Sequence, residues 1–518
     1  MKKYFKKLFF KYHIGQIRGY RKLKKSNKLD KIIEIKSRIL DVPIKRQAFI
    51  RYVRCSNLNA HNSYLQYLSS NLLSLRFNQA YLYSLANNKP LCYPLPREWQ
   101  FFLSENYIKV NFFASSILWR IFIFYKWLQG FSRGLKLLFN DISKKSTSNK
   151  QSVYFHDISK KTIESVINRE KSVISFLIDK LEYKNIVRIT HNLEIQEKNL
   201  SSKWLEFSKT NGSPILNQIE TLKFFLLFIY YSLFCFLCVF IRPVNAIFLE
   251  EYLKVFRLKV VGSNKLENAY FFNNSCFLYR PLWSYHAEDR GSDVIFYFYS
   301  TNMEGFQVEN RNYFLERFYI TSWSRYLVWD EYQKRLIESL NNNNPRIDIF
   351  GPISLYSSEE LLKIPPNSVA VFDVTPFRDS FYVKMGLPYS YYTPQNNYLF
   401  LNKINLALYK NEKNMAHKYK RKSNLINKKY FYFLRRIADR KNYFQLDTNL
   451  DARSIILKTK GCISMPFTST ALIAKKEGKP TVYFDPLGKI KSSDPAAHGI
   501  EIINTSKELE SWISKNIK

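Results

Sequence analysis

Three consecutive hydroxyl side chains stand where an apolar, strand-like segment gives way to a helical pattern. The start of a helix has unpaired N–H groups and the positive end of the helix dipole, so it can hold phosphate oxygens. Each hydroxyl can add one O–H donor, and a proline just before them fixes the direction of the chain. Capping of the helix explains one hydroxyl, whereas three in a row favour an anion site. The predicted site comprises Pro466, Phe467, Thr468, Ser469 and Thr470.

A strand pattern over 414–419 ends in a cationic segment. Alternation along a strand places His417 on one face and Lys418 with Lys420 on the other. Cations compensate the charge of a departing diphosphate, and a histidine can protonate it. We therefore expect His417 to act as an acid and both lysines to bind the leaving group. The run from Lys420 to Lys422 is also typical of a solvated surface in a basic chain.

An acidic pair precedes the apolar strand pattern at 294–299. Glu288 or Asp289 can act as a general base that takes the proton from an attacking hydroxyl, and His286 is a further candidate. The same residues are also typical of an exposed turn, because Gly291 follows them. The sequence alone leaves both interpretations open.

Two further polar positions follow strand-like segments. Asp373 ends an apolar run and is placed to bind ribose or sugar hydroxyls, while Gly351 and Pro352 let the backbone approach a nucleotide base. Each position is also typical of a turn. No D-x-D sequence flanked by strands is evident, so the sequence predicts neither a metal site nor a bound cofactor.

Strand and helix patterns alternate regularly from Leu266 onward. Such alternation is typical of a parallel sheet covered by helices on both faces, whose ligands bind beyond the carboxyl ends of the strands. The sequence therefore predicts an α/β protein in three parts. They are a mainly helical N-terminal region (1–210), a portion of an N-terminal α/β domain (211–325) and a Rossmann-like nucleotide-binding domain (326–518).

The segment 224–241 is apolar and uncharged, and its length is at the lower limit for crossing a bilayer. A span would place its flanking segments on opposite sides of the membrane, which is awkward if they share one domain. We therefore expect a buried or membrane-dipping helix, with a true span as the alternative. The basic, amphipathic stretch 1–11 can lie on an anionic membrane or form a solvated helix.

The chain of 518 residues carries 80 Lys and Arg against 42 Asp and Glu, a net charge of +38. This charge favours nucleic acid or an anionic membrane surface as a partner. No RNP-like strand, zinc finger or helix-turn-helix pattern is present, so nucleic acid is not expected. Six cysteines without a repeated spacing favour a reducing cytosol. We expect a cytoplasmic protein held peripherally or monotopically at the inner face of the cell membrane.

The segment 461–486, GCISMPFTSTALIAKKEGKPTVYFDP, resembles the bacterial polysaccharide-biosynthesis proteins named for a PFTS motif. The motif itself stands at 466–469, and similar segments begin at Pro281 and Val369. The resemblance covers roughly the C-terminal half of the chain and is weak before Glu220. It implies a role in the synthesis of capsule, O-antigen or a related surface glycan.

More distantly, the layout is similar to sialyltransferase and Kdo-transferase families. These families imply a GT-B-like fold, with two Rossmann-type domains facing a cleft, and a CMP-activated donor. Ser469-Thr470 matches their hydroxyl pair and Glu288-Asp289 approximates their acidic pair, whereas a lysine replaces the proline that follows their histidine at His417.

The two resemblances together imply a metal-independent glycosyltransferase. It would move a sugar from a nucleotide-sugar donor to a lipid-linked or polysaccharide acceptor. A polyol-phosphate transferase of teichoic-acid type is the alternative among enzymes, and a nucleic-acid-binding protein is the alternative from another class.

Overall fold

The computed structural model describes most of the chain from residue 57 onward. Before that point, only residues 18–19, 21–22, 35, 38–42 and 44 are described. The predicted amphipathic stretch 1–11 and Lys420 therefore lie outside the described residues. The other residues left out are 74, 144–150, 168–171, 184–185, 194–204, 211, 213, 275–278, 302–303, 310, 314–320, 341–343, 354–362, 379–380, 383–390 and 421–424.

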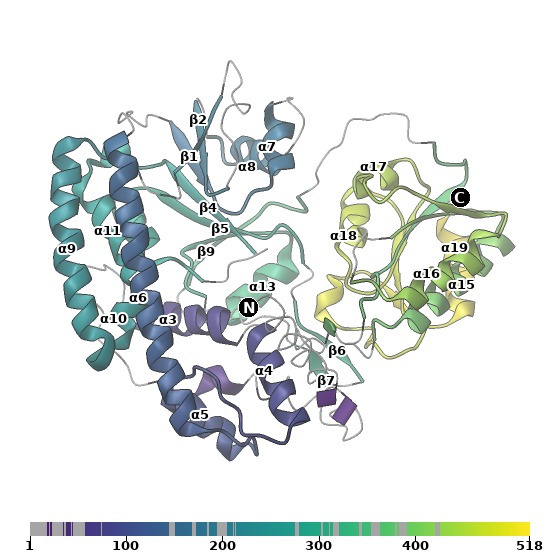
Figure 1. Cartoon of the computed structure of the whole chain (residues 1–518). Helices are drawn as coiled ribbons and strands as arrows, with labels where there is room; N and C mark the ends of the chain where they lie inside the picture. The colour runs from purple at the N-terminus through teal and green to yellow at the C-terminus, as the bar shows by residue number, and fades with distance from the viewer. Residues whose placement is uncertain are drawn as a thin grey trace, which may run out of the picture.

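The first domain is built on a seven-stranded sheet in which all pairings are parallel (Figure 1). Its strand order is β3-β2-β1-β4-β5-β8-β9. Strands buried on both faces read as continuous apolar runs, and β4 is an example. The strands are β1 (Ser152–Phe155), β2 (Arg188–His191), β3 (Glu206–Lys209), β4 (Ala269–Asn273), β5 (Asp293–Tyr297), β8 (Arg325–Val328) and β9 (Arg346–Ile349).

The second domain is built on a six-stranded parallel sheet with the order β12-β11-β10-β13-β14-β15. Counted along the chain this is 3-2-1-4-5-6, the doubly wound order, and the first sheet follows it too with β9 as an added strand. The direction of winding reverses at β1/β4 and at β10/β13, where such folds bind ligands. The strands are β10 (Ser368–Phe372), β11 (Asn414–Lys418), β12 (Tyr443–Gln445), β13 (Cys462–Ser464), β14 (Thr481–Phe484) and β15 (Ile502–Ile503).

Helices precede and cover both sheets (Figure 1). The N-terminal helices are α3 (Asn57–Leu72), α4 (Leu75–Ala86), α5 (Arg97–Glu105) and α6 (Phe112–Ser143). The first domain adds α7 (Lys160–Ile167), α8 (Val173–Lys180), α9 (Gln218–Ile241), α10 (Pro243–Ile247), α11 (Leu249–Val260), α12 (Leu282–Asp289) and α13 (Glu331–Leu340). The second domain has α15 (Pro394–Lys410), α16 (Lys428–Ala438), α17 (Ala452–Leu457), α18 (Ser469–Lys476) and α19 (Ser506–Asn516). Short 3-10 helices are η1 (Ile39–Asp41), η3 (Ser263–Lys265) and η5 (Pro495–Ala497).

The predicted fold class is confirmed, whereas the predicted domain limits are wrong at two places. The region 1–210 does begin with helices, but β1, β2 and β3 lie inside it and form one edge of the first sheet. The predicted boundary at residue 326 cuts through β8, which pairs with β5 of the first sheet. Local patterns identify a strand but not the sheet that it joins, so the second domain begins only near β10.

The structure is thus an α/β protein of GT-B-like organisation, with two Rossmann-type domains and a helical N-terminal region. A hairpin of β6 (Phe306–Val308) and β7 (Arg311–Tyr313) leaves the first domain and contacts the second, where Val308 bridges Ile490. The described parts of the two domains therefore touch along the side where β5 ends.

Candidate active site between two parallel sheets

The PFTS segment lies at the point where the second sheet reverses its direction of winding. Ser464, at the end of β13, is in register with Phe372 at the end of β10. Asp373 follows β10 directly, and α18 begins at Ser469 a few residues after β13. The segment thus occupies the position where doubly wound sheets hold nucleotides.

Thr468 is the N-cap residue of α18, but its side chain does not cap the helix. The hydroxyl instead donates a hydrogen bond to the carbonyl of Met465 at 2.9 Å. The hydroxyl of Thr470 lies 3.1 Å from that of Ser464 and 3.3 Å from that of Thr468. Simple capping therefore does not explain why these hydroxyls gather at the helix start.

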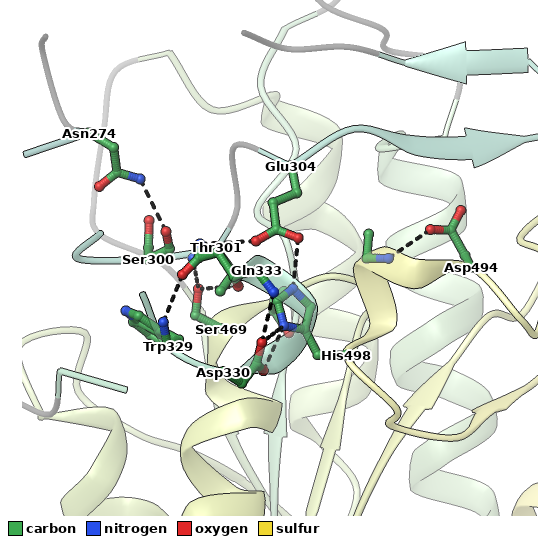
Figure 2. Close-up of polar contacts among 12 residues, drawn as sticks. Asn274, Ser300, Thr301, Glu304, Trp329, Asp330, Gln333, Ser469, Asp494 and His498 are labelled. Atoms are coloured by element: carbon green, nitrogen blue, oxygen red, sulfur yellow. Dashed lines mark hydrogen bonds and ion pairs between the residues drawn. The ribbon is translucent and has the colours of Figure 1, made fainter. Parts of the chain in front are cut away.

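Ser469 is the hydroxyl that reaches the other domain. The N–H of Thr301, just beyond the end of β5, donates to Ser469 Oγ at 3.4 Å, and the two hydroxyl oxygens are 3.5 Å apart (Figure 2). The start of α18 therefore faces the carboxyl edge of the first sheet.

Phe467 holds this turn in an unusual backbone conformation. Its φ is +64°, in the left-handed region that bulky residues rarely adopt. The ring lies 4.6 Å from the ring of Phe306 on the β6–β7 hairpin, while Pro466 is buried. Strained residues of this kind concentrate at functional sites, and here the strain orients the hydroxyls that follow.

His417 and Asp373 come together, but below the surface of the site. Both side chains are fully buried, and His417 Nε2 lies 3.6 Å from an Asp373 oxygen. His417 Nδ1 bonds the hydroxyl of Tyr443 at 2.8 Å, and Tyr430 donates to Asp373 at 2.6 Å. In this conformation His417 supports Asp373 and does not reach the strand tip where we expected it to meet a phosphate.

One oxygen of Asp373 has no hydrogen-bond partner among the described residues. A buried carboxylate oxygen without a partner is costly, so it indicates a place for a ligand hydroxyl or an ordered water. Lys418, the next residue after His417, is half-buried at the end of β11.

The structure places Gly351 and Pro352 away from the start of α18. They follow β9 on the edge of the first sheet, and Gly351 has φ +80°. The ammonium of Lys476, the last residue of α18, donates to the Pro352 carbonyl at 3.0 Å. These residues contact the far end of the helix, so the expectation that they meet a nucleotide base in the second domain is not met.

Glu288 and Asp289 lie at the opposite edge of the first sheet from the one that faces Ser469. They end α12, which leads into the amino end of β5. Arg280 donates to Glu288 at 2.5 Å, and Ser324, which precedes β8, donates to its other oxygen. The expected position of this pair across the cleft is wrong. Glu288 and Asp289 come before β5, at its amino end, whereas Ser469 faces the residues that follow the carboxyl end of β5.

A polar cluster that the sequence analysis did not single out lies at the reversal point of the first sheet. His156 and Asp157 follow β1, and their side chains are 3.6 Å apart. The hydroxyl of Tyr154 lies 2.8 Å from His156 Nδ1, and Asn192 donates to Asp157 at 2.9 Å. The available signal was a His-Asp pair after an apolar run, and it was missed because β1 was not predicted.

His156 is a neutral imidazole at pH 7. Burial, the largest effect, lowers its pKa, Lys254 lowers it further, and Asp157 opposes both, so that the pKa is about 4. The side chain is 15% exposed. A neutral, partly accessible imidazole can accept a proton, and the Asp157 carboxylate offsets part of the penalty that burial and Lys254 place on the resulting cation.

Polar residues connect this cluster to the start of α18 along the carboxyl edge of the first sheet. Asn273, at the end of β4, donates to the carbonyl of His156 at 3.1 Å. Asn274 donates to the carbonyl of Ser300 at 3.1 Å, and Thr301 is the residue that meets Ser469 (Figure 2). A series of polar contacts, made by largely buried side chains, therefore joins the reversal points of the two sheets.

A second buried cluster joins the two domains. His498, which follows η5 in the second domain, lies between Glu304 and Asp330 of the first (Figure 2). Its Nε2 is 2.7 Å from Glu304, and its Nδ1 is 2.7 Å from Asp330. We call these three residues the interdomain clamp.

The clamp has a charge pattern that opposes anion binding. Burial tends to lower the pKa of His498, but hydrogen bonds and charges from Asp330 and Glu304 raise it to about 9. Burial raises the pKa of Glu304, whereas the bonds from His498 lower that of Asp330 despite its burial. The imidazolium of His498 is already bonded to two acidic side chains, so the clamp is a contact between domains and offers no free cation for a phosphate.

Asp330 also caps α13, because one of its carboxylate oxygens accepts a hydrogen bond from the Gln333 N–H at 3.0 Å. The pairing with His498 has no local sequence signal, because the two residues are 168 positions apart. Among the described residues, no group of three or more His, Cys, Asp or Glu has an arrangement suited to a metal ion. Cys235 and Cys238 are free thiols.

Several solved structures are similar to this chain at low sequence identity. The E. coli trehalose-6-phosphate structure bound with UDP-2-fluoro glucose is 10% identical, with a TM-score of 0.38, and the match covers 71% of this chain and 91% of that one. Anabaena Alr3699/HepE, in complex with UDP and glucose, is 9% identical, with a TM-score of 0.36 and coverages of 71% and 90%. The UDP-GlcNAc 2-epimerase of Methanocaldococcus jannaschii is 10% identical, with a TM-score of 0.36 and coverages of 71% and 92%. No curated protein matches the chain.

The family model described as "Polysaccharide biosynthesis PFTS motif protein" matches residues 227–513, which is more than half of the chain. The match includes the PFTS sequence itself at 466–469, with the turn and helix start described above. The chain belongs to the polysaccharide biosynthesis PFTS motif family.

Proposed function

We propose that this protein is a glycosyltransferase that moves a sugar from a nucleotide-sugar donor to a growing surface polysaccharide, such as capsule or O-antigen. The observation that carries the proposal is the start of α18, whose Ser469 hydroxyl faces the carboxyl edge of the first sheet at Thr301. Membership of a polysaccharide biosynthesis family supplies the class of product.

The donor binds at the reversal point of the second sheet in this proposal. The N–H groups at the start of α18 and the hydroxyls of Ser469 and Thr470 hold the phosphates, because they combine free donors with a positive dipole end. Asp373, which follows β10, has an unpartnered oxygen that accepts a hydrogen bond from a ribose or sugar hydroxyl once its buried side chain moves toward the ligand.

The acceptor binds at the reversal point of the first sheet. His156 takes the proton of the acceptor hydroxyl while the oxygen of that hydroxyl attacks the anomeric carbon of the donor sugar. The bond from the anomeric carbon to the donor phosphate breaks in the same step. The electron pair of the broken bond goes to the phosphate, which the start of α18 stabilises. Asp157 then holds the imidazolium until its proton is released.

The test is nucleotide binding by the wild type and a double variant. Thermal-shift and titration experiments with UDP-, CMP- and GDP-sugars identify the donor. Ser469→Ala with Thr470→Ala should then weaken its binding by at least about a hundredfold, since two hydrogen bonds to a charged group are lost. A matched control is Thr505→Ala, which removes the hydroxyl that caps α19 in the same domain.

Equal donor affinity in the double variant and the wild type would overturn the phosphate site. Binding of an activated polyol phosphate, with no sugar nucleotide bound, would favour the polyol-phosphate transferase instead. Binding to RNA that falls steeply with salt, with no nucleotide sugar bound, would favour a nucleic-acid-binding protein.

A further inference from the structure

Helices α6 and α9 form an antiparallel pair on the outside of the first domain. Trp127 of α6 donates to the Ser232 carbonyl of α9 at 2.9 Å, and Arg120 donates to the Phe240 carbonyl at 3.0 Å. Both helices also pack on α11, which lies on their inner side (Figure 1). The pair therefore presents its outer side away from the core of the domain.

The outer side of this pair is apolar and exposed over its whole length. On α9, Leu226, Leu233 and Leu237 expose 61, 61 and 68% of their surface. Soluble proteins rarely expose contiguous apolar patches of this extent unless a partner covers them. We call this surface the α6–α9 face, and it comprises Ile117, Ile121, Phe124 and Leu128 on α6 with Leu222, Leu226, Ile229, Leu233, Leu237 and Phe240 on α9.

Apart from one acid near an end of each helix, Asp141 in the last turn of α6 and Glu220 in the first turn of α9, the charged residues of the two helices are cations. No Asp or Glu occurs in 112–139 or in 221–242. The six charged residues of these ranges are Arg120, Lys126, Arg133, Lys136, Lys223 and Arg242. Lys223 and Arg242 are exposed and flank the uncharged run of α9, which is about 27 Å long at 1.5 Å per residue.

This pattern identifies the occupant as an anionic lipid surface. An apolar face bordered by cations matches the boundary between acyl chains and negative headgroups, where each cation near the surface adds to binding. A second copy of this chain would bring the same cations to the contact, and they would repel one another.

By length and composition α9 is the one described helix able to cross a membrane, and only 39% of its most apolar window is buried. It cannot cross as a single span while the first domain is folded. β3 before it and β4 after it lie in the same sheet, and its first turn is tied to that domain by an ion pair of 2.7 Å between Glu220 and Lys265. Both ends of α9 therefore remain on one side of any bilayer.

We propose that the protein docks on an anionic membrane through the α6–α9 face, with both helices lying in the plane of the interface. The second domain lies on the opposite side of the first sheet from α9 (Figure 1). Docking therefore leaves the second domain, and the edge of the first sheet that faces it, uncovered. The proposal stands on these helices and does not depend on the proposed glycosyl transfer.

The test is flotation of the full chain with vesicles of phosphatidylglycerol and phosphatidylcholine. Leu226→Glu with Leu233→Glu places two carboxylates on the face, and Leu128→Glu does the same from α6. The double variant should lower vesicle binding by at least about tenfold, since each leucine buries apolar surface only when the protein is bound. The matched control is Leu406→Glu with Tyr432→Glu, two exposed positions on the second domain.

The expected result is flotation of the wild type and the control, with loss in both face variants at unchanged melting temperature and unchanged nucleotide binding. Flotation of the face variants like the wild type would overturn the proposal. Absence of wild-type flotation would also overturn it, as would a wild-type dimer in light scattering that the face variants dissociate without any vesicle binding.

Discussion

His156 and His498 lie in similarly buried surroundings but in opposite charge states, because their neighbours differ. His156 has one carboxylate nearby and a lysine that adds positive charge, and its pKa falls to about 4. His498 lies between two carboxylates, and its pKa rises to about 9. The first histidine is therefore suited to accept a proton at neutral pH, and the second to remain an imidazolium that holds two domains together.

Replacement of His156 by asparagine should reduce transfer by about a hundredfold to ten-thousandfold, the usual contribution of a general base. Donor affinity should be unchanged, because His156 lies on the first sheet. In the wild type, the rate should stay level from pH 7 to pH 5 and fall only near the His156 pKa of about 4. His61→Asn on α3 is the control, and a variant His156→Asn with full turnover would contradict the assignment.

Replacement of His498 by asparagine should lower stability in a pH-dependent way. Because the folded pKa is raised above the ordinary value of 6.5, the stabilisation is fully present below pH 6.5 and is lost as pH rises through about 9. Asparagine tolerates the left-handed backbone of this residue, φ 53°, so the comparison isolates the ion pairs.

Urea unfolding of wild type and His498→Asn at pH 6 and pH 10 measures this effect. The difference in unfolding free energy should be about 3 kcal/mol at most at pH 6, and clearly smaller at pH 10. An equal loss at both values would mean that packing alone, and not charge, explains the role of His498.

At the scale of elements, the β6–β7 hairpin fixes how the two domains meet. It leaves the first domain after β5 and reaches the second, where the N–H of Glu309 donates to the Lys489 carbonyl at 3.0 Å. The ring of Phe306 packs on Phe467, the residue of the PFTS turn with positive φ. The contact between Phe306 of the first domain and Phe467 of the second therefore involves the same turn that orients Ser469.

Phe306→Ala should loosen the domains and the PFTS turn together. Loss of the ring should lower the free energy of the contact between the domains by about 1–3 kcal/mol. This is less than for a phenylalanine in the core of one domain, because the ring lies at an interface and is not enclosed on all sides. Hydrogen exchange should become faster at 466–470, and small-angle scattering should show a larger radius of gyration. Phe400→Ala, buried inside the second domain, should lower the melting temperature without either change.

At the scale of the whole molecule, the structure separates three kinds of surface. Polar contacts join the two sheets at the carboxyl edges of the strands, the interdomain clamp joins the two domains, and the exposed α6–α9 face belongs to helices that lie on the outer side of the first domain. A net charge of +38 adds a long-range attraction to anionic surfaces. If both proposals hold, the first domain binds a membrane through this face while the second binds a soluble donor.

The sequence by itself determined the features that local patterns encode. Alternating strand and helix patterns established the α/β class, and the PFTS segment identified the family and the start of α18. The apolar helix at 224–241 was also evident from neighbouring residues. Each of these depends on residues within a few turns of one another.

Only the tertiary structure decided which distant segments share a surface. In the structure β8 belongs to the first sheet, and Glu288 lies at the edge of that sheet opposite Ser469. His417 is buried beside Asp373, and His498 lies between Glu304 and Asp330. It also showed that both ends of α9 return to one domain. Strand order depends on pairings between separate segments, such as Val153 with Ala269, and the domain contact joins residues 168 positions apart. No local spacing in the sequence records either of them.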